Sequence, residues 1–125
     1  MMYPELLEQM NQQYTTLSRS SIERATDYAL ANLSNRITLT DLEKVSGLSQ
    51  RALHNAFIKR FQMSPMQWVK QQRLVLVRKS LLNSYAQKTV TEIATSFGFF
   101  NLGSFAVEYK KKFGESPSET LLHKK

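Results

Sequence analysis

The 125-residue sequence has no cysteine, only four glycines and three prolines, and no apolar run long enough to span a bilayer. Without cysteine, disulfides and thiolate-based metal or catalytic sites are excluded. So little glycine and proline favours helices over a turn-rich β fold. The first residues, MMYPELLEQM, are partly acidic and lack the apolar segment of a signal peptide. We therefore expect a cytoplasmic protein with no membrane partner.

Residue patterns that would indicate catalysis or metal binding are also missing. The two histidines, His54 and His123, are far apart in the sequence. There is no carboxylate pair at a telling spacing, no glycine-rich phosphate loop and no zinc-type ligand cluster. We expect no enzyme activity, no metal and no cofactor.

Positive charge is concentrated in one part of the chain, which has a formal net charge of +7. Residues 1–35 contain four acidic residues and two arginines, a balance of −2, so the remaining residues carry +9. A basic domain suggests a polyanionic partner, because each phosphate contact releases counterions. A basic surface that only aids solubility would have the same composition, so charge alone does not decide.

The strongest structural signal is an internal repeat. The segment LTDLEKVSGLSQRALHNAFIKRFQMSPMQWV, from Leu39, matches VTEIATSFGFFNLGSFAVEYKKKFGESPSETL, from Val90. Leu42 aligns with Ile93 and, after one inserted residue, Phe57 aligns with Tyr109. A register that survives on both sides of the insertion indicates a duplicated unit.

Each copy has the pattern of a helix, a short turn and a second helix. A hydroxyl residue followed three positions later by an acid begins the first helix, a glycine ends it, and a polar residue caps the second helix. These signals are Thr38, Asp41, Gly47 and Ser49 in the first copy, and Thr89, Glu92, Gly98 and Asn101 in the second.

Other helices complete an all-α prediction. A helix after Ser20 can bury Ile22, Ala25, Ala29 and Leu33, and Pro65 to about Leu82 forms a connecting helix about 27 Å long. The fold class is all-α, with about seven helices in two helix-turn-helix subdomains joined by this long helix. The expected divisions are a linker remnant or N-terminal extension at 1–17, a first lobe with the connecting helix at 18–83, and a second lobe at 84–125.

From about Ile22 to Leu122 the chain resembles the DNA-binding domain of AraC/XylS-type transcriptional regulators. The motifs that carry the resemblance are LTDLEKVSGLSQRALHNAFIKRF, SPMQWVKQQRL, VTEIATSFGF and FAVEYKKKFGESPSETL. The resemblance implies a monomeric reader of double-stranded DNA, with one recognition helix per lobe in adjacent major grooves. It further implies a nucleoid location, regulation through RNA polymerase, and dimerisation of an intact regulator through an N-terminal domain. A fragment of a longer regulator is favoured over a solitary-domain protein.

Polar residues on the second helix of the first copy predict base reading. Helical periodicity turns Gln50, Arg51, His54 and Asn55 outward. Arginine can bridge two acceptors on guanine, and asparagine or glutamine can pair with adenine. By resemblance, Arg51, His54 and Asn55 occupy base-contacting positions. The alternative is an ordinary exposed polar face.

The corresponding helix of the second copy has few polar groups to offer. Gly103 permits close approach to a groove, Leu102 and Val107 can touch thymine methyls, and Ser104 can reach a phosphate. Glu108 is repelled by phosphates unless it meets a cytosine amine. We therefore predict that the first lobe dominates base readout. Phe100, at the inserted position, is expected to be exposed.

Contacts to the DNA backbone are expected at helix N-termini and at cations. The backbone N–H groups after Thr38, Ser49, Thr89 and Asn101 can bind phosphates. The cations Lys59, Arg60, Lys110 and Lys111 end the two predicted recognition helices, where they also complement the helix dipole. By resemblance, Arg73 is a characteristic arginine of the connecting helix, and two roles stay open for it: a phosphate contact or an ion pair between the lobes.

A helical protein-interaction module is the competing interpretation. The apolar Leu102, Ala106 and Val107 favour it for the second lobe, which would then bind polymerase or an effector domain, with DNA affinity incidental. RNA binding is less favoured, because the aromatic residues are expected in the core rather than on a stacking platform.

Overall fold

The computed structural model describes residues 20–83 and 87–122, and within them it is all-helical. The predicted extension at 1–17 and the predicted lobe boundary at 84 lie outside the described residues. The described helices, seven in all as expected, are α2 (Ser21–Ala31), α3 (Leu39–Ser46), α4 (Gln50–Phe61), α5 (Pro65–Leu82), α6 (Val90–Ser96), α7 (Leu102–Phe113) and α8 (Pro117–Leu122).

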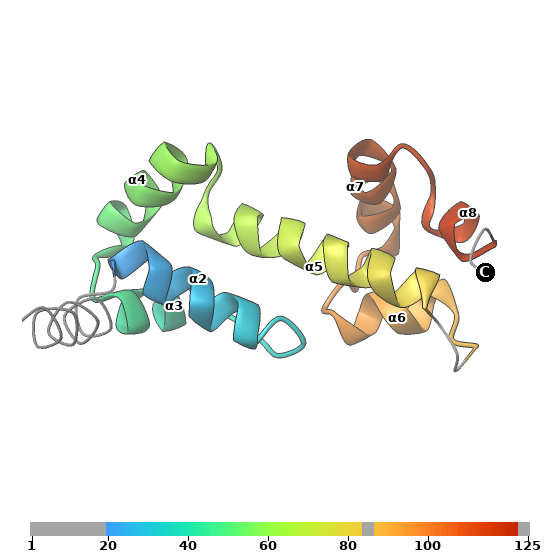
Figure 1. Ribbon diagram of the computed structural model, residues 1–125, viewed down its shortest axis with the longest axis horizontal. Coiled ribbons are helices and arrows are strands. Elements are labelled where there is room, and N and C mark those ends of the chain that lie inside the picture. Colours follow the sequence, from blue (N-terminus) through green and yellow to red (C-terminus); the bar gives the residue numbers. More distant parts are fainter. Residues whose placement is uncertain (1–19, 84–86, 123–125) are drawn as a thin grey trace, which may run out of the picture.

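Two lobes share the long helix α5 (Figure 1). Helices α2 and α4 pack against α5 in the first lobe, and α3 packs against α2 and α4. In the second lobe α6 and α8 pack against α5, and α7 packs against α6 and α8. Both α4 and α7 rise on the same side of α5, one near each of its ends (Figure 1). The predicted arrangement of two helix-turn-helix units joined by one connecting helix is therefore confirmed.

The predicted start signals form the expected hydrogen bonds. Thr38 Oγ1 accepts from the backbone N–H of Asp41, whose carboxylate accepts from the N–H of Thr38, closing a capping box. Thr89 and Glu92 form the same box at α6. Such caps stabilise a helix end by about 1 kcal/mol, because N–H groups there lack partners in the helix.

Glycines terminate the first helix of each unit in the left-handed conformation. Gly47, with φ +74°, caps α3, and Gly98, with φ +87°, follows α6. The residue inserted in the second turn, Phe100, has 79% of its surface exposed, as expected. Because an inserted residue at a turn displaces no core side chain, the register of α7 survives.

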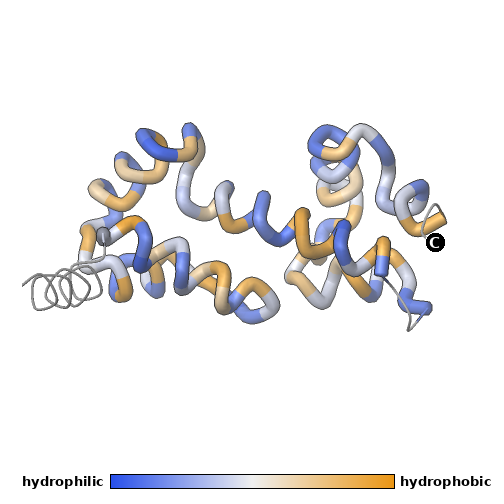
Figure 2. The backbone as a smooth tube through the Cα atoms, in the orientation of Figure 1, coloured by the Kyte–Doolittle hydropathy of each residue, from blue (hydrophilic) through white to orange (hydrophobic). Residues whose placement is uncertain are grey.

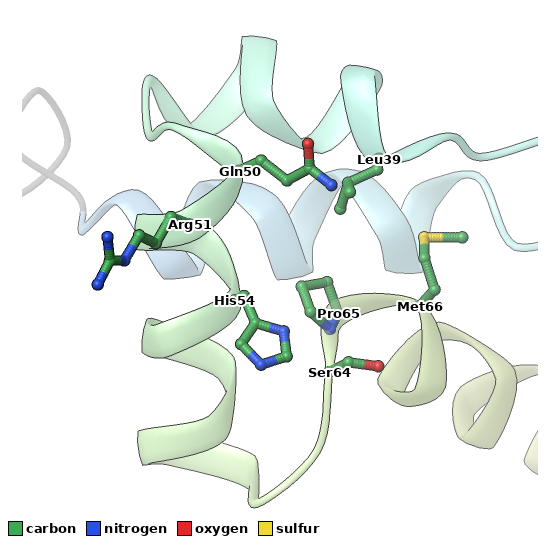
Figure 3. A pocket seen from close by; sticks show the side chains of 7 residues that line it. All are labelled: Leu39, Gln50, Arg51, His54, Ser64, Pro65 and Met66. Atoms are coloured by element: carbon green, nitrogen blue, oxygen red, sulfur yellow. The ribbon is translucent and has the colours of Figure 1, made fainter.

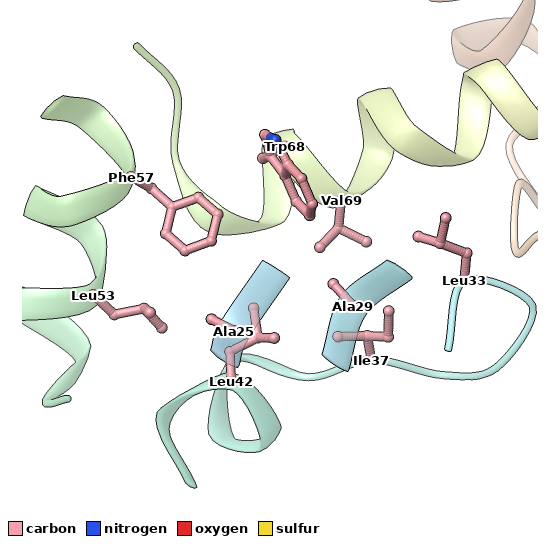
Figure 4. Packing of buried hydrophobic residues seen from close by; sticks show 9 residues of the cluster. All are labelled: Ala25, Ala29, Leu33, Ile37, Leu42, Leu53, Phe57, Trp68 and Val69. Atoms are coloured by element: carbon pink, nitrogen blue, oxygen red, sulfur yellow. The ribbon is translucent and has the colours of Figure 1, made fainter. Parts of the chain in front are cut away.

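Apolar residues recur along the helices (Figure 2). Those that are buried form two separate cores. In the first, Phe57 of α4 lies against Trp68 of α5, and Leu53 lies on the side of Ala25 and Leu42 (Figure 4). The second is formed by Leu74, Val77, Leu81, Ile93, Ala94, Phe105 and Tyr109. Helix α5 thus contributes its first turns to one core and its later turns to the other, which joins the lobes covalently and by packing.

The repeat is visible in burial as well as in sequence. Phe57 and its counterpart Tyr109 are fully buried, and so is Leu53, while Phe105 is nearly so. Tyr109 additionally donates its hydroxyl to Thr120 Oγ1 at 2.8 Å, which ties α7 to α8. Burial raises the pKa of this tyrosine, so its hydroxyl remains a donor.

One helix ends earlier than expected. Leu33 is buried, but it lies beyond α2, which ends at Ala31 with Asn32 as its cap. Hydrogen bonds from Asn32 to Ala29 and from Asn35 to Asn32 replace the helical pattern there. Periodicity identified the buried residue correctly because the turn after α2 still directs Leu33 to the core.

Candidate nucleic-acid interface

The outward face of α4 presents the predicted reading residues together. Gln50, Arg51, His54 and Asn55 are all exposed, while Leu53 and Phe57 on the same helix are fully buried. This division follows from helical periodicity, since residues three and four apart lie on one face. The structure therefore places four polar side chains at the start of α4, free to meet a partner.

The N-terminus of α4 is open in a way that suits an anion. Ser49 Oγ accepts from the N–H of Ala52, which satisfies one of the first N–H groups of the helix. The N–H groups of Gln50 and Arg51 precede the helical ladder. Asn101 caps α7 in the same manner, with its side-chain oxygen accepting from Ser104.

A hollow of about 580 Å³ borders the reading residues of α4 (Figure 3). Figure 3 shows the His54 ring turned toward Ser64 and Pro65, and the Arg51 guanidinium directed away from them. The lining residues are Leu39, Gln50, Arg51, His54, Ser64, Pro65 and Met66. The starts of α3, α4 and α5 thus meet at one place beside the candidate base-reading face.

The outward face of α7 is largely apolar. Val107 has 69% of its surface exposed, and Leu102 and Gly103 are exposed beside it. A side-chain Cβ at Gly103 would lie no closer than 3.6 Å to another group, the Asn101 side-chain oxygen. The helix can therefore approach a surface closely, but it offers few hydrogen-bonding groups on that face.

The cations at the ends of the two reading helices reach solvent. Lys59 and Arg60 on α4, and Lys110 and Lys111 on α7, are exposed. The Arg60 guanidinium lies 5.7 Å from the centre of the Phe61 ring, a cation–π distance. These groups place positive charge at the C-terminal end of each candidate reading helix.

Glu108 lies in an environment that the sequence did not indicate. Its carboxylate forms an ion pair with Lys70 of α5, with Nζ and Oε1 3.2 Å apart. The sequence-based expectation considered only DNA phosphates and cytosine amines for this residue. A cation 38 residues away in the chain is its partner instead.

The structure gives Arg73 partners that neither proposed role included. Its Nε and Nη2 donate hydrogen bonds to the carbonyl oxygens of Leu33 and Asn35, at 3.1 and 2.7 Å. Burial lowers the pKa of this guanidinium. Arg73 does hold parts of the fold together, but through main-chain carbonyls and not through the ion pair that was considered.

Two further features of the described residues bear on function. None of the helices within them combines the length and apolar composition that a membrane crossing requires. Within residues 20–83 and 87–122, acidic and histidine side chains nowhere gather in groups of three or more that could hold a metal ion.

Comparison with known proteins identifies the family. A family model described as a helix-turn-helix domain matches residues 42–123. The crystal structure of a probable AraC family transcriptional regulator from Rhodopseudomonas palustris CGA009 aligns with a TM-score of 0.78 and 38% identity, covering 82% of this chain and 94% of that one. The chain belongs to the AraC/XylS-type family of helix-turn-helix transcriptional regulators.

Curated relatives of this AraC/XylS-type domain are longer than the chain. It is 36% identical over 104 residues to XylDLEGF operon transcriptional activator 2 of Pseudomonas putida, covering 82% of this chain and 66% of that protein. It is 39% identical over 101 residues to a probable thc operon regulatory protein of Rhodococcus erythropolis, covering 80% of this chain and 30% of that protein. The chain thus spans two thirds or less of the length of these two relatives.

Sequence reasoning missed the polar side of α5 in this AraC/XylS-type domain. Gln67, Lys70 and Gln71 recur at spacings of three and one, on a face that packs against neither core. A search for polar as well as apolar periodicity would have singled out Lys70.

Proposed function

We propose that this chain binds double-stranded DNA sequence-specifically, with α4 and α7 in adjacent major grooves, and so regulates transcription. The observation that carries the proposal is that the second helices of two helix-turn-helix units rise on the same side of one 18-residue helix. That helix is about 27 Å long, comparable to the roughly 34 Å between successive major grooves on one DNA face. The names of the relatives, which are operon regulators, support the same role.

In this proposal the two lobes contribute differently. Arg51, with His54 and Asn55, reads base edges from α4, because guanidinium and amide groups can form bidentate hydrogen bonds in the major groove. Helix α7 fits its groove through Gly103 and Val107, with apolar contacts in place of hydrogen bonds. The uneven distribution of exposed polar groups between α4 and α7 supports this asymmetry.

Backbone contacts complete the proposed interface. The capped N-termini at Thr38, Ser49, Thr89 and Asn101 supply N–H groups to phosphates. Ser104 and the exposed cations Lys59, Arg60, Lys110 and Lys111 add side-chain contacts. Arg73 is assigned a structural role instead, because carbonyl oxygens occupy two of its nitrogens.

The protein partner in this proposal is RNA polymerase, and the location is the nucleoid. The domain itself acts as a monomeric reader, and the relatives called activators support activation over repression. Sedimentation of the chain with a single-site duplex should give one chain per duplex. A stoichiometry of two would contradict the monomeric reader.

Selection from a random duplex library, followed by titration of the selected duplex across a salt series, tests the function. We expect a consensus of two half-sites about one helical turn apart, and an affinity that falls steeply as salt rises. An unrelated duplex of equal length is the control. No enrichment, with no affinity even at low salt, would reject the proposal.

A helical protein-interaction module is the second candidate function. The observation in its favour is the exposure of Phe100 and Val107 on the second lobe, at 79% and 69%. Large exposed apolar residues often mark protein contacts. Binding of the chain to purified RNA polymerase without DNA, lost in a Phe100→Ser variant, would favour this candidate if the duplex selection fails.

A further inference from the structure

A groove runs between the connecting helix α5 and the reading helix α7, outside the residues already assigned to base reading. It has a volume of about 410 Å³. Gln67, Lys70 and Gln71 line it from α5, and Glu108, Lys111 and Lys112 from α7. A second hollow adjoins it, and Lys70 and Glu108 line both.

Lys70 and Glu108 therefore stand between the groove and the candidate DNA-facing surface of α7. The second hollow, of about 490 Å³, is lined by Gly103, Ser104 and Val107 in addition to this ion pair. Those three residues belong to the face of α7 that the proposed function turns toward DNA. Lys70 thus lies at the edge of that face, although it comes from a different helix.

The ion pair itself is too exposed to be explained by stability. The Lys70 and Glu108 side chains are 45% and 36% accessible to solvent. Exposed pairs of this kind stabilise a fold little, because water screens the charges and two long side chains must be ordered. The pair is better explained by where it holds the lysine, at the junction of the two hollows.

The charge of the groove matches an anionic partner. Three lysines and one carboxylate leave a net charge of +2 along its walls. The ammonium group of Lys70 has three N–H donors, so it can keep Glu108 as a partner and still donate to a phosphate. Pairing with Lys70 offsets part of the charge of Glu108, so this carboxylate repels an approaching phosphate less.

The position of the groove matches that partner as well. Helix α5 spans the distance between α4 and α7 (Figure 1). If those helices enter successive major grooves, the phosphate backbones that separate the grooves must pass alongside the flank of α7 that faces α4. Lys70 lies on α5 between Val69 of the first core and Leu74 of the second, so it stands between the two lobes and beside α7.

We propose that Lys70, held by Glu108, is a DNA-backbone contact between the two reading helices, and that the groove between α5 and α7 receives the phosphates separating the two major grooves. This inference rests on the proposed function and adds a site to it. The contact positions the domain on DNA and carries no base information, because phosphates are common to all sequences.

The test is a salt titration of the full chain on the selected duplex and on an unrelated duplex. Lys70→Gln should reduce the slope of log affinity against log salt by about one. It should lower the affinity for the selected and the unrelated duplex by the same factor. Lys79→Gln is the matched control: it removes the same charge from another exposed position of α5, nine residues on and hence on the opposite face. Equal slopes for the two variants would overturn the inference.

Two more variants separate a phosphate contact from a structural one. Lys70→Arg keeps the charge and should keep the wild-type slope. Glu108→Gln removes the negative charge beside the phosphates and should tighten binding about two- to fivefold, the range of an exposed charge interaction. If the pair serves only to hold α7 against α5, Glu108→Gln will instead weaken binding as much as Lys70→Gln does, and the inference fails.

The outcomes also distinguish this inference from the function beneath it. If the wild-type chain binds DNA selectively but Lys70→Gln and Lys79→Gln have equal slopes, the proposed function stands and the phosphate contact of Lys70 is rejected. Absence of DNA binding by the wild-type chain rejects both. Circular dichroism of each variant confirms that the helices are intact before its slope is compared.

Discussion

The Nε of Arg73 donates a hydrogen bond of 3.1 Å to the carbonyl oxygen of Leu33, in the turn that follows α2. Its Nη2 donates to Asn35 in the same turn, and its Nη1 lies 3.6 Å from where a Cβ on Gly98 would be. Gly98 belongs to the turn of the second lobe. One side chain of the connecting helix therefore ties α5 to the turn after α2 and extends toward the turn of the second lobe, and its planar guanidinium suits two carbonyl groups at once.

Replacing Arg73 should destabilise the domain. Arg73→Ala removes two charge-assisted hydrogen bonds, each of which is worth about 1.5–3 kcal/mol, and leaves two carbonyls to water. We expect the free energy of unfolding, measured by urea denaturation, to fall by at least the value of one such bond, about 1.5–3 kcal/mol. Arg73→Lys should restore less than half of the lost free energy of unfolding, because the lysine ammonium cannot donate to both carbonyl oxygens in the planar geometry of a guanidinium.

The exposed Lys79 of α5 provides the control for that measurement. Lys79→Ala should change the free energy of unfolding by no more than about 0.5 kcal/mol, as surface substitutions generally do. If Arg73→Ala changes the free energy of unfolding no more than Lys79→Ala does, the two guanidinium hydrogen bonds do not stabilise the fold.

Substitutions on the two reading helices should have unequal effects on DNA selectivity. Arg51→Ala removes a bidentate group from α4, so it should cost about 1–3 kcal/mol on the selected duplex and relax preference at one base pair. Val107→Ala shortens an apolar side chain of α7 and should change little. Affinities on duplexes varied at single positions measure both, and equal losses would refute the predicted asymmetry.

Gly103→Ala should separate folding from binding. The new methyl group meets nothing closer than 3.6 Å, and alanine favours a helix over glycine by about 0.5–1 kcal/mol, so α7 should gain stability. Affinity for the selected duplex should fall nonetheless, because the methyl group occupies the space through which α7 approaches the groove. Thermal unfolding and DNA titration of the same preparation measure the two effects.

Gly47→Ala is the contrasting control. No atom lies within 4 Å of a Cβ there, but the backbone has φ +74°, which costs an L-residue about 1–2 kcal/mol. It should therefore destabilise the domain.

An unchanged DNA affinity in Gly103→Ala would show that α7 does not need the glycine for close approach.

Acid should remove part of the stability that the α3 capping box provides. The hydrogen bond from the Thr38 backbone N–H lowers the pKa of Asp41 below its ordinary value of 3.8, and the Thr38 side chain lowers it further. A carboxyl whose pKa is lower in the folded state stabilises the fold above 3.8, and that contribution is lost as pH falls through the folded pKa.

Asp41→Asn tests this linkage. Wild type should be more stable than the variant near neutral pH, and the difference should shrink as pH falls to about 3. Urea unfolding monitored by circular dichroism at several pH values gives the comparison. A difference that does not depend on pH would mean that the carboxylate charge contributes nothing at this cap.

Local signals carried most of the fold prediction. Ser49 and Asn101 act within three residues of their own positions, and Gly47 and Gly98 act through their own backbone angles. Interactions over so few residues can be predicted from the local sequence alone. The repeat adds a second source of prediction, because the two copies align. A core position in one copy, such as Phe57, predicts that its counterpart in the other, Tyr109, is also buried.

The candidate site was predictable only in part. Outward positions on α4 follow from the buried ones, so the exposure of Arg51 and His54 could be derived by periodicity. The partners of Glu108 and Arg73 could not, because they lie 38 to 40 residues away in the chain. No local pattern records a contact of that separation.

The sequence by itself determined the helices, their caps, the doubled unit and the identity of both cores, because apolar periodicity and capping act over a few residues. Only the tertiary structure decided that α4 and α7 rise on one side of α5, that Arg73 binds the turn after α2, and that Lys70 meets Glu108 beside the surface of α7. Those relations depend on the rotation of one packed helix against another, which the two cores set together and which neither segment specifies alone.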